Sequence, residues 1–295
     1  MGINGKTKVY GIIGDPVEHT LSPLIHGIAA DELGIDMVYV PFHVAAGCLE
    51  AALKGAYGLN IQGLNVTVPY KSAVIPFLEK VDRTAMAVGS VNTLVRGACG
   101  EGFTGYNTDM GGLRRAMQED GIELRNAQVI ILGAGGVGRA VAFMCADSGA
   151  QKIYLLNRNG AKAEAVAAEV NRSHSAGAGE CVTAMELAEY PKLLTGAENS
   201  YIVIQCTSVG LAPGVDDVVI EDSDFYRRVK YGYDLIYTPW ETRFMRHVKE
   251  NGGMAYNGLK MLLYQGVEAF ELWNGCQVTK QIEDKIYRRL CERFK

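Results

Sequence analysis

The feature that most constrains the fold is a glycine-rich turn between two apolar segments. Residues 133–138 read Gly-Ala-Gly-Gly-Val-Gly, which matches the pattern G-x-G-x-x-G. The preceding segment, QVIIL, has the composition of a buried strand, and the following one, RAVAFMCADSG, that of a helix. This order predicts a βαβ unit in which the turn and the helix N-terminus bind the pyrophosphate of a dinucleotide. A turn without a ligand is the less favoured alternative.

The end of the next predicted strand indicates which dinucleotide is bound. NAD sites usually place an acidic residue about 20 residues after the turn, where it binds the ribose 2′-hydroxyl. Here the strand expected at 152–156 is followed by Asn157, Arg158, Asn159 and, shortly after, Lys162. An arginine can hold a 2′-phosphate with two hydrogen bonds, and a lysine adds positive charge. The sequence therefore favours NADP over NAD, with solvent-exposed loop cations as the alternative.

Strand-like and helical segments alternate along most of the chain. In the first third, strands are expected at 9–14, 37–44 and 63–68, and helices at 22–33 and 49–57. The first of these helices is expected to have a serine as N-cap, Ser22, because a proline follows it. This alternation predicts an α/β fold with a mainly parallel sheet covered by helices.

The second part of the chain continues the alternation and then ends in helices. Strands are expected at 128–132, 152–156, 201–206 and 232–237. One helix is expected to follow the glycine turn and to end at about residue 148, and the others at 108–120, 161–172, 241–251, 259–273 and 279–294. Residues 174–180 are expected to form a loop. A chain of 295 residues is long for one hydrophobic core. We therefore expect a first domain of about 1–107 and a second of about 108–257.

Composition argues against several other classes of protein. The 29 Lys and Arg against 33 Asp and Glu give a net charge of −4, which disfavours a nucleic-acid partner. No apolar run approaches the ~18 residues that cross a bilayer, and the N-terminus lacks signal-peptide features, so we expect a cytoplasmic protein without a membrane partner. The seven cysteines and five histidines show no metal-binding spacing, so no metal site is expected.

Polar side chains gather at the ends of the apolar segments of the first domain. Two hydroxyls, Thr20 and Ser22, precede a helix, where they are suited to bind a carboxylate. Further polar side chains lie in the segments 65–71, 90–93 and 106–109. Because strand ends and the loops after them line the ligand crevice of a parallel sheet, these clusters predict a polar pocket.

These segments together resemble the shikimate dehydrogenase family. The matches are spread over almost the whole chain in the family's order: GDPVEHTLSPLIH, GLNVTVPYK, VGSVNTL, GYNTDMGG, GAGGVGRA, LLNRNGAKA, DLIYTPWETRF and NGLKMLLYQGVEAF. The resemblance implies an N-terminal α/β substrate domain completed by C-terminal helices, at 1–107 and 258–295. It also implies a Rossmann-type NADP-binding domain at 108–257.

The resemblance also implies roles for individual residues. Lys71 and Asp109 match the family's catalytic pair. The residues expected to bind substrate are Thr20, Ser22, Asn65, Thr67, Asn92, Asp109, Tyr237 and Gln265. The residues expected to contact the cofactor are Gly133, Ala134, Gly135, Gly136, Val137, Asn157, Arg158, Asn159, Lys162 and Gly258.

The activity that the resemblance implies is the reversible, NADP-dependent reduction of 3-dehydroshikimate to shikimate, within aromatic amino acid biosynthesis. Hydride transfer to a carbonyl leaves an alkoxide, which the ammonium of Lys71 can stabilise and protonate. Two alternatives stay open: a quinate/shikimate dehydrogenase that uses NAD or NADP, and a non-catalytic ligand-sensing domain. The sequence leaves the oligomeric state undecided, a homodimer included.

The chain departs from the family at a few positions. Gln205 and Cys206 stand where the family has Asn-Ala, Asn159 replaces a common hydroxyl residue, and Thr238 replaces an asparagine. Thr20 replaces a frequent serine and keeps the hydroxyl. These changes are expected to affect cofactor preference and affinity more than the type of reaction.

Overall fold

The computed structural model describes residues 2–98, 102–174, 180–195 and 200–294. The chain divides into two compact units, unit 1 (Met1–Arg115 with Lys260–Lys295) and unit 2 (Ala116–Leu259). Most of the loop expected at 174–180 lies outside the described residues. In the described part of the chain, no helix is both long and apolar enough to span a bilayer.

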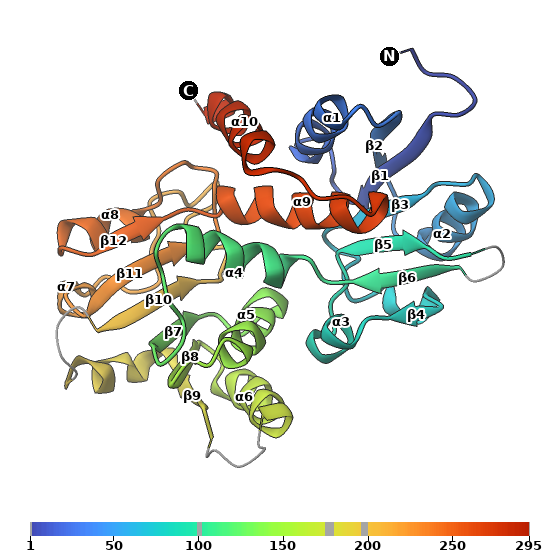
Figure 1. The fold of residues 1–295 in the computed structure, drawn as a ribbon. Coiled ribbons are helices and arrows are strands. Elements are labelled where there is room, and N and C mark those ends of the chain that lie inside the picture. The colour runs from blue at the N-terminus through green and yellow to red at the C-terminus, as the bar shows by residue number, and fades with distance from the viewer. Residues whose placement is uncertain (1, 99–101, 175–179, 196–199, 295) are drawn as a thin grey trace. The chain divides into compact units, whose positions relative to one another are not determined.

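Unit 1 is built on a mixed six-stranded sheet in the order β2–β1–β3–β5–β6–β4 (Figure 1). Its strands are β1 Lys8–Gly14, β2 Met37–His43, β3 Gly63–Val66, β4 Lys80–Val81, β5 Thr93–Arg96 and β6 Phe103–Tyr106. β1 is parallel to β2 and β3, and β4 is parallel to β6. β5 is antiparallel to both β3 and β6. The mainly parallel sheet is thus confirmed, but the hairpin of β5 and β6 was not predicted.

The helical segments of unit 1 surround this sheet, and the chain passes into unit 2 within α4 and returns at the start of α9. These segments are α1 Ser22–Leu33, α2 Leu49–Gly58, η1 Ile75–Phe77, α3 Arg83–Val88, α4 Asp109–Glu119, α9 Leu259–Asn274, α10 Lys280–Cys291 and η3 Glu292–Phe294. The prediction that Ser22 caps α1 is wrong. Leu21 is the N-cap residue and already has near-helical dihedrals, so Ser22 is the first helical residue and its hydroxyl does not cap the helix.

The C-terminal helices complete the core of unit 1. Trp273 of α9 stacks on Tyr10 of β1, with ring centroids 5.0 Å apart, and its indole N–H donates to the carbonyl of Leu94 in β5 at 2.9 Å. A Cβ on Gly63 of β3 would collide with the Trp273 indole, so this close approach requires glycine. Helix α10 packs against α1. Segments from both ends of the chain therefore form one core.

Unit 2 has a six-stranded, fully parallel sheet in the order β12–β11–β10–β7–β8–β9. Its strands are β7 Gln128–Leu132, β8 Lys152–Asn157, β9 Val182–Glu186, β10 Tyr201–Gln205, β11 Val229–Asp234 and β12 Met254–Tyr256. Its helical segments are α5 Gly136–Asp147, α6 Gly160–His174, η2 Leu187–Thr195, α7 Ser223–Tyr226 and α8 Arg243–Glu250. This strand order is that of a Rossmann fold, as expected.

One strand of unit 2 lies earlier than predicted. The sequence indicated a strand at 232–237, whereas β11 ends at Asp234, which is fully buried. The Asp234 carboxylate accepts the backbone N–H of Ile236 at 3.0 Å and the hydroxyl of Thr242 at 2.6 Å. These bonds turn the chain out of the sheet, so Tyr237 lies in the following loop.

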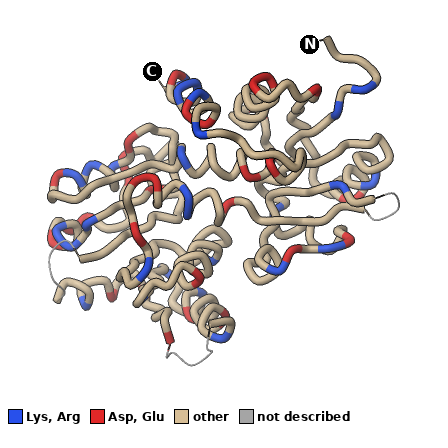
Figure 2. Tube along the Cα trace, in the orientation of Figure 1, with Lys and Arg blue, Asp and Glu red and all other residues tan. Residues whose placement is uncertain are grey.

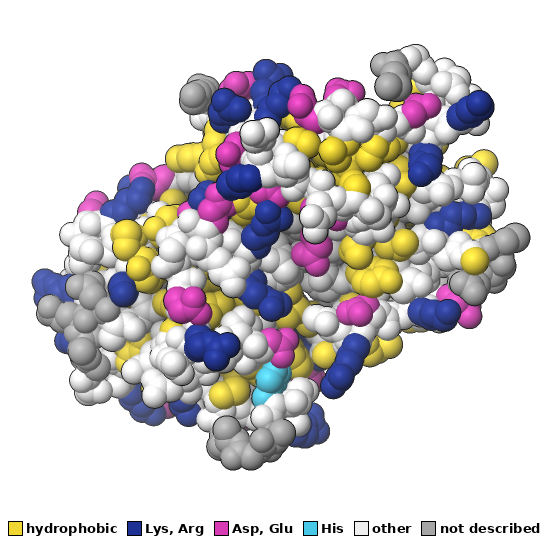
Figure 3. Space-filling view, viewed as in Figure 1, with side chains coloured by type: hydrophobic (Ala, Val, Ile, Leu, Met, Phe, Trp, Pro, Cys, Tyr) yellow, Lys and Arg dark blue, Asp and Glu magenta, His cyan; other side chains and the backbone are white. Residues whose placement is uncertain are grey.

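The surface carries charges of both signs close together. Figure 2 shows this mixture along α10, where Lys280 pairs with Asp284 at 3.2 Å and Arg289 with Glu292 of η3 at 3.1 Å. The face seen in Figure 3 likewise has basic side chains interspersed with acidic ones. Exposed pairs of this kind contribute roughly 0–1 kcal/mol each to stability.

Candidate active site

A lysine and an aspartate from separate segments of unit 1 are in direct contact. Lys71 lies in the turn after β3, and Asp109 is the first residue of α4. The Lys71 ammonium donates to Oδ2 of Asp109 at 2.8 Å, with side chains 29% and 18% exposed. The pair is therefore held in place but still accessible to a ligand.

Asn92 fixes the second oxygen of the aspartate. Its Nδ2 donates to Oδ1 of Asp109 at 2.9 Å and lies 3.5 Å from Oε1 of Gln265. Its own Oδ1 accepts the backbone N–H of Thr108 at 2.8 Å, and the residue is only 2% exposed. Each Asp109 oxygen thus has its own donor, which fixes the orientation of the carboxylate.

The topology of the sheet explains why these residues meet. β1, β3 and β6 run in one direction and β5 in the other, so the carboxyl ends of the first three lie at the same edge as the start of β5. Thr20 and Ser22 follow β1, Thr67 and Lys71 follow β3, Asn92 precedes β5 and Asp109 follows β6. The polar residues predicted in the first domain therefore gather at one edge of the sheet.

The two hydroxyls of the first loop contact each other. The Thr20 hydroxyl donates to Oγ of Ser22 at 3.2 Å, and the Ser22 backbone N–H donates to Oγ1 of Thr20 at 3.3 Å. Thr67 is half-buried, and its backbone N–H donates to the carbonyl of Ile13 at 2.9 Å. Tyr237 belongs to unit 2, where burial raises the pKa of its phenol.

Two residues that the sequence analysis missed, Tyr39 and His26, support this cluster. Tyr39 donates to Oδ1 of Asn65 at 2.7 Å, and Nε2 of His26 lies 3.3 Å from the same oxygen. The Asn65 amide donates to Oγ1 of Thr93 at 3.1 Å. The sequence offered two signals for them: His26 is a histidine on an otherwise apolar face of the first helix, and Tyr39 brings a hydroxyl into an apolar strand.

The glycine turn of unit 2 has the geometry that its sequence predicts. Gly133 has a φ of +104°, in the region that favours glycine. A Cβ on Gly138 would overlap the carbonyl oxygen of Gly133, so helix α5 can approach the turn only because residue 138 is glycine. A Cβ on Gly135 or Gly136 would meet nothing within 4 Å, which leaves open space above the turn. This combination fits a pyrophosphate.

The end of β8 is organised by two asparagines. Asn157 accepts the backbone N–H of Ala134 at 3.2 Å and donates to the carbonyl of Asn159 at 3.0 Å. Oδ1 of Asn159 accepts the backbone N–H of Lys162 at 3.2 Å. Arg158, between them, is exposed. The loop is thus rigid while its guanidinium faces solvent, which fits a 2′-phosphate ligand.

Arg158 lines a hollow of about 710 Å³ beside the ends of β8 and β9. Three carboxylates line the same hollow: Glu164, Glu186 and Glu189. Glu189 forms an ion pair with Lys192. Negative charge here opposes the attraction of a phosphate, so this part of the site bears on cofactor choice.

The structure also shows the surroundings of two other residues of unit 2 that the sequence analysis singled out. Gln205 accepts the backbone N–H and the hydroxyl of Thr207 at 2.6 and 2.7 Å, and it donates to the carbonyl of Val209 at 3.0 Å. This departure from the family pattern therefore orders the loop after β10. Gly258 donates its N–H to the carbonyl of Ile236 at 3.1 Å, and a Cβ there would collide with the Leu235 carbonyl.

Two adjacent glycines let α9 approach α4 in unit 1. A Cβ on Gly111 would meet the carboxylate of Glu268. A Cβ on Gly112 would come 2.5 Å from the backbone nitrogen of Gln265. The close crossing brings Gln265 to Asn92, and it buries most of Glu268 between the two helices.

Glu268→Gln should stabilise the protein at alkaline pH. Burial raises the pKa of Glu268 from 4.5 to about 7, so the folded state holds a proton that the unfolded chain releases. Other charged groups act on this carboxyl, namely Arg114, Glu271, Asp109 and Arg115. Stability is therefore lost as pH rises from 4.5 through 7. We expect the variant to gain about 1–2 kcal/mol at pH 8 and little at pH 5, in urea unfolding. An equal gain at both pH values would contradict this assignment.

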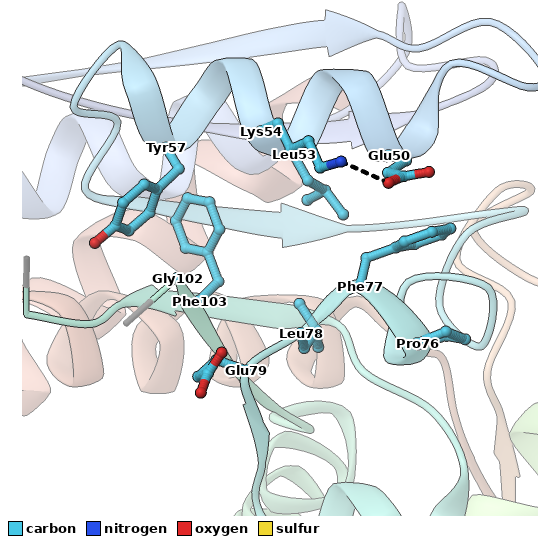
Figure 4. A pocket seen from close by; sticks show the side chains of 10 residues that line it. All are labelled: Glu50, Leu53, Lys54, Tyr57, Pro76, Phe77, Leu78, Glu79, Gly102 and Phe103. Atoms are coloured by element: carbon cyan, nitrogen blue, oxygen red, sulfur yellow. Dashed lines mark hydrogen bonds and ion pairs between the residues drawn. The ribbon is translucent and has the colours of Figure 1, made fainter. Parts of the chain in front are cut away.

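Unit 1 has a hollow of about 530 Å³ between α2 and the segment 76–79 (Figure 4). Leu53 and Phe103 line it together with Tyr57, whose ring meets the Phe103 ring edge-on at 5.6 Å. Glu50 and Lys54 form an ion pair at its rim, at 2.7 Å. The predicted site residues that the structure describes are not among those that line it.

Known families match the chain in three successive parts. The shikimate dehydrogenase substrate binding domain matches residues 12–94, the shikimate/quinate 5-dehydrogenase family residues 115–212, and the shikimate 5′-dehydrogenase C-terminal domain residues 258–280. The shikimate dehydrogenase (NADP+) of Desulforamulus reducens is 41% identical over 276 residues, 92% of each chain.

Solved structures are similar over the whole length. A crystal structure of a shikimate dehydrogenase in complex with NADP+ has a TM-score of 0.89 at 35% identity, covering 100% of this chain and 98% of that one. Shikimate 5-dehydrogenase of Listeria monocytogenes, in complex with shikimate and NAD, has a TM-score of 0.88 at 31% identity, with 98% of both chains covered.

Proposed function

The chain belongs to the shikimate dehydrogenase family, and from that premise we propose that it interconverts 3-dehydroshikimate and shikimate, with NADP as cofactor. It is an oxidoreductase acting on a CH–OH group. The observation that carries the proposal is the contact of Lys71 with Asp109 at 2.8 Å, in a cluster of amides and hydroxyls. A carbonyl reduction needs a proton donor at the carbonyl oxygen, and this pair supplies one.

Lys71 acts as the general acid in reduction and as the base in oxidation. The nicotinamide of the cofactor, when bound, would supply or accept the hydride. As the carbonyl carbon is reduced, negative charge develops on its oxygen, and the adjacent ammonium stabilises that charge and then donates a proton. Asp109 holds the ammonium at the reacting oxygen, because its own second oxygen is fixed by Asn92.

The substrate is held by the polar groups around this pair. The hydroxyls of Thr20 and Ser22 bind the carboxylate, and Thr67, Asn92 and Gln265 bind the ring hydroxyls. Support comes from the common edge of the sheet at which these residues lie. The role expected for Tyr237 in substrate binding stays a prediction, as do the cytoplasmic location and the assembly state, a homodimer included.

The cofactor is held by unit 2. Its pyrophosphate would be held by the turn formed by Gly133, Ala134, Gly135, Gly136 and Val137, because a Cβ on Gly135 or Gly136 would meet open space. The ribose 2′-phosphate would be held by Asn157, Arg158, Asn159 and Lys162 at the end of β8. Gly258 completes the contacts expected for the cofactor.

An absorbance assay at the nicotinamide band tests the proposal directly. Shikimate or quinate is paired with NADP+ or NAD+, and we expect the highest kcat/KM with shikimate and NADP+. Absence of turnover in all four pairings, with a folded protein, would refute the proposed activity.

A second candidate is a quinate/shikimate dehydrogenase that also uses NAD. The observation in its favour is the set of carboxylates, Glu164 and Glu186 among them, that line the hollow beside Arg158. These charges weaken the attraction of a 2′-phosphate without affecting NAD. Efficient turnover of quinate with NAD+ in the same assay would favour this candidate.

A further inference from the structure

We propose that Tyr39 is a positioning residue that acts on the Lys71–Asp109 pair through Asn65, Thr93 and Asn92. The inference rests on the proposed function and deepens it.

Four partners within the protein hold the Asn65 side chain. Its oxygen has two acceptor sites, taken by the Tyr39 hydroxyl at 2.7 Å and by Nε2 of His26 at 3.3 Å. Its nitrogen has two donors, which go to the carbonyl of Asn92 at 3.2 Å and the hydroxyl of Thr93 at 3.1 Å. The residue is only 4% exposed, so these four contacts set its orientation.

The protonation states at this point are fixed by the chemistry of the contacts. The backbone carbonyl of Asn92 can only accept a hydrogen bond, so the Asn65 nitrogen must face it. The Asn65 oxygen then faces His26, which must therefore carry its proton on Nε2. Burial lowers the pKa of His26 to about 3, and its Nδ1, the deprotonated nitrogen, is buried without a partner. Burial also raises the pKa of Tyr39 well above its usual value, so the hydroxyl stays a donor.

The connection runs on from Asn65 to the catalytic pair without a gap. The Thr93 hydroxyl donates to Oδ1 of Asn92 at 3.1 Å, and Nδ2 of Asn92 donates to Asp109 at 2.9 Å. Asp109 in turn accepts the Lys71 ammonium. A shift of Asn65 would therefore move Asn92, and with it the carboxylate that orients the proton donor.

Tyr39→Phe tests the inference, with Tyr10→Phe as its matched control. Tyr10 lies in the same sheet and the same aromatic cluster, but its hydroxyl donates only to Asn274, at 3.4 Å. We expect Tyr39→Phe to lower kcat/KM for shikimate about ten-fold, because small misplacements of catalytic groups are costly, and to leave the KM for NADP+ unchanged. Tyr10→Phe should retain both constants.

The split between kcat and KM separates positioning from a loss of folded protein. In Tyr39→Phe, the KM for shikimate should rise as kcat falls, because Asn92 and Asp109 are displaced and both are expected to bind the substrate. A smaller folded fraction would lower kcat without changing KM. Thr93→Val, which cuts the same connection and keeps the side-chain shape, should have the same effect, so the test survives if Tyr39→Phe does not fold.

The outcomes distinguish the two proposals. If the wild-type protein oxidises shikimate and both variants match it in kcat and KM, the positioning role is wrong and the proposed function stands. If Tyr39→Phe and Thr93→Val combine additively in kcat/KM in a double-mutant cycle, the connection between them is refuted. If the wild-type protein shows no turnover, the proposed function fails and the positioning role fails with it.

Discussion

Replacing Lys71 with alanine should lower kcat for shikimate oxidation by a factor of about 10²–10⁴. The lysine is the group in contact with Asp109 that can exchange a proton with the substrate hydroxyl, and alanine removes both the base and the positive charge. The KM for NADP+ should change little, because the contacts proposed for the cofactor lie in unit 2. Steady-state rates measured over a range of both substrates give the two constants separately.

Lys54→Ala is the matched control for this experiment. Lys54 is an exposed lysine of the same unit whose partner, Glu50, lies one helical turn away at 2.7 Å. Its removal should leave kcat at the wild-type value. A Lys71→Ala enzyme that folds and retains a kcat near wild type would remove the lysine from the mechanism.

Replacing Arg158 with alanine should raise the Kd for NADP+ about 10- to 100-fold and leave the Kd for NAD+ nearly unchanged. A hydrogen bond to a charged group contributes roughly 1.5–3 kcal/mol, and only NADP+ has the phosphate that forms it. Titration calorimetry with each cofactor measures both values without any turnover.

Arg172→Ala provides the comparison for the loss of a positive charge. Arg172 is an exposed arginine in the last turn of α6, and its removal should leave both cofactors unaffected. Equal weakening of NADP+ and NAD+ by Arg158→Ala would show that the arginine does not recognise the 2′-phosphate. The carboxylate of Glu186 would then be the first residue to examine for cofactor choice.

The elements that could be predicted from sequence are those with a strong local signal. The glycine turn is such a case, because strand, turn and helix are contiguous and each glycine has a steric reason. β5 and β6 have four residues each and a glycine-containing connection, so their periodicity is too short to recognise. The end of β11 depends on the bonds of Asp234 to Ile236 and Thr242, and the second of these comes from farther along the chain.

The candidate site was predictable only as far as the family's motifs reach. Lys71, Asp109 and Asn92 each lie in a segment with a recognisable pattern. Tyr39 and His26 belong to segments that are otherwise apolar, and their importance comes from meeting Asn65 across the sheet. The expectation for Ser22 as a cap failed because Leu21 already has near-helical dihedrals.

The discontinuity of unit 1 has a consequence for synthesis on the ribosome. Tyr10 is translated early, yet its stacking partner Trp273 belongs to α9, near the end of the chain. At bacterial or eukaryotic elongation rates this delay is on the order of ten seconds or more. Unit 2, which is continuous in sequence, can reach its native state while the nascent first sheet still has an uncovered apolar face. A product that terminates before Trp273 therefore has a folded unit 2 and a unit 1 with exposed apolar surface. Such a product is expected to be bound by chaperones and degraded by proteases.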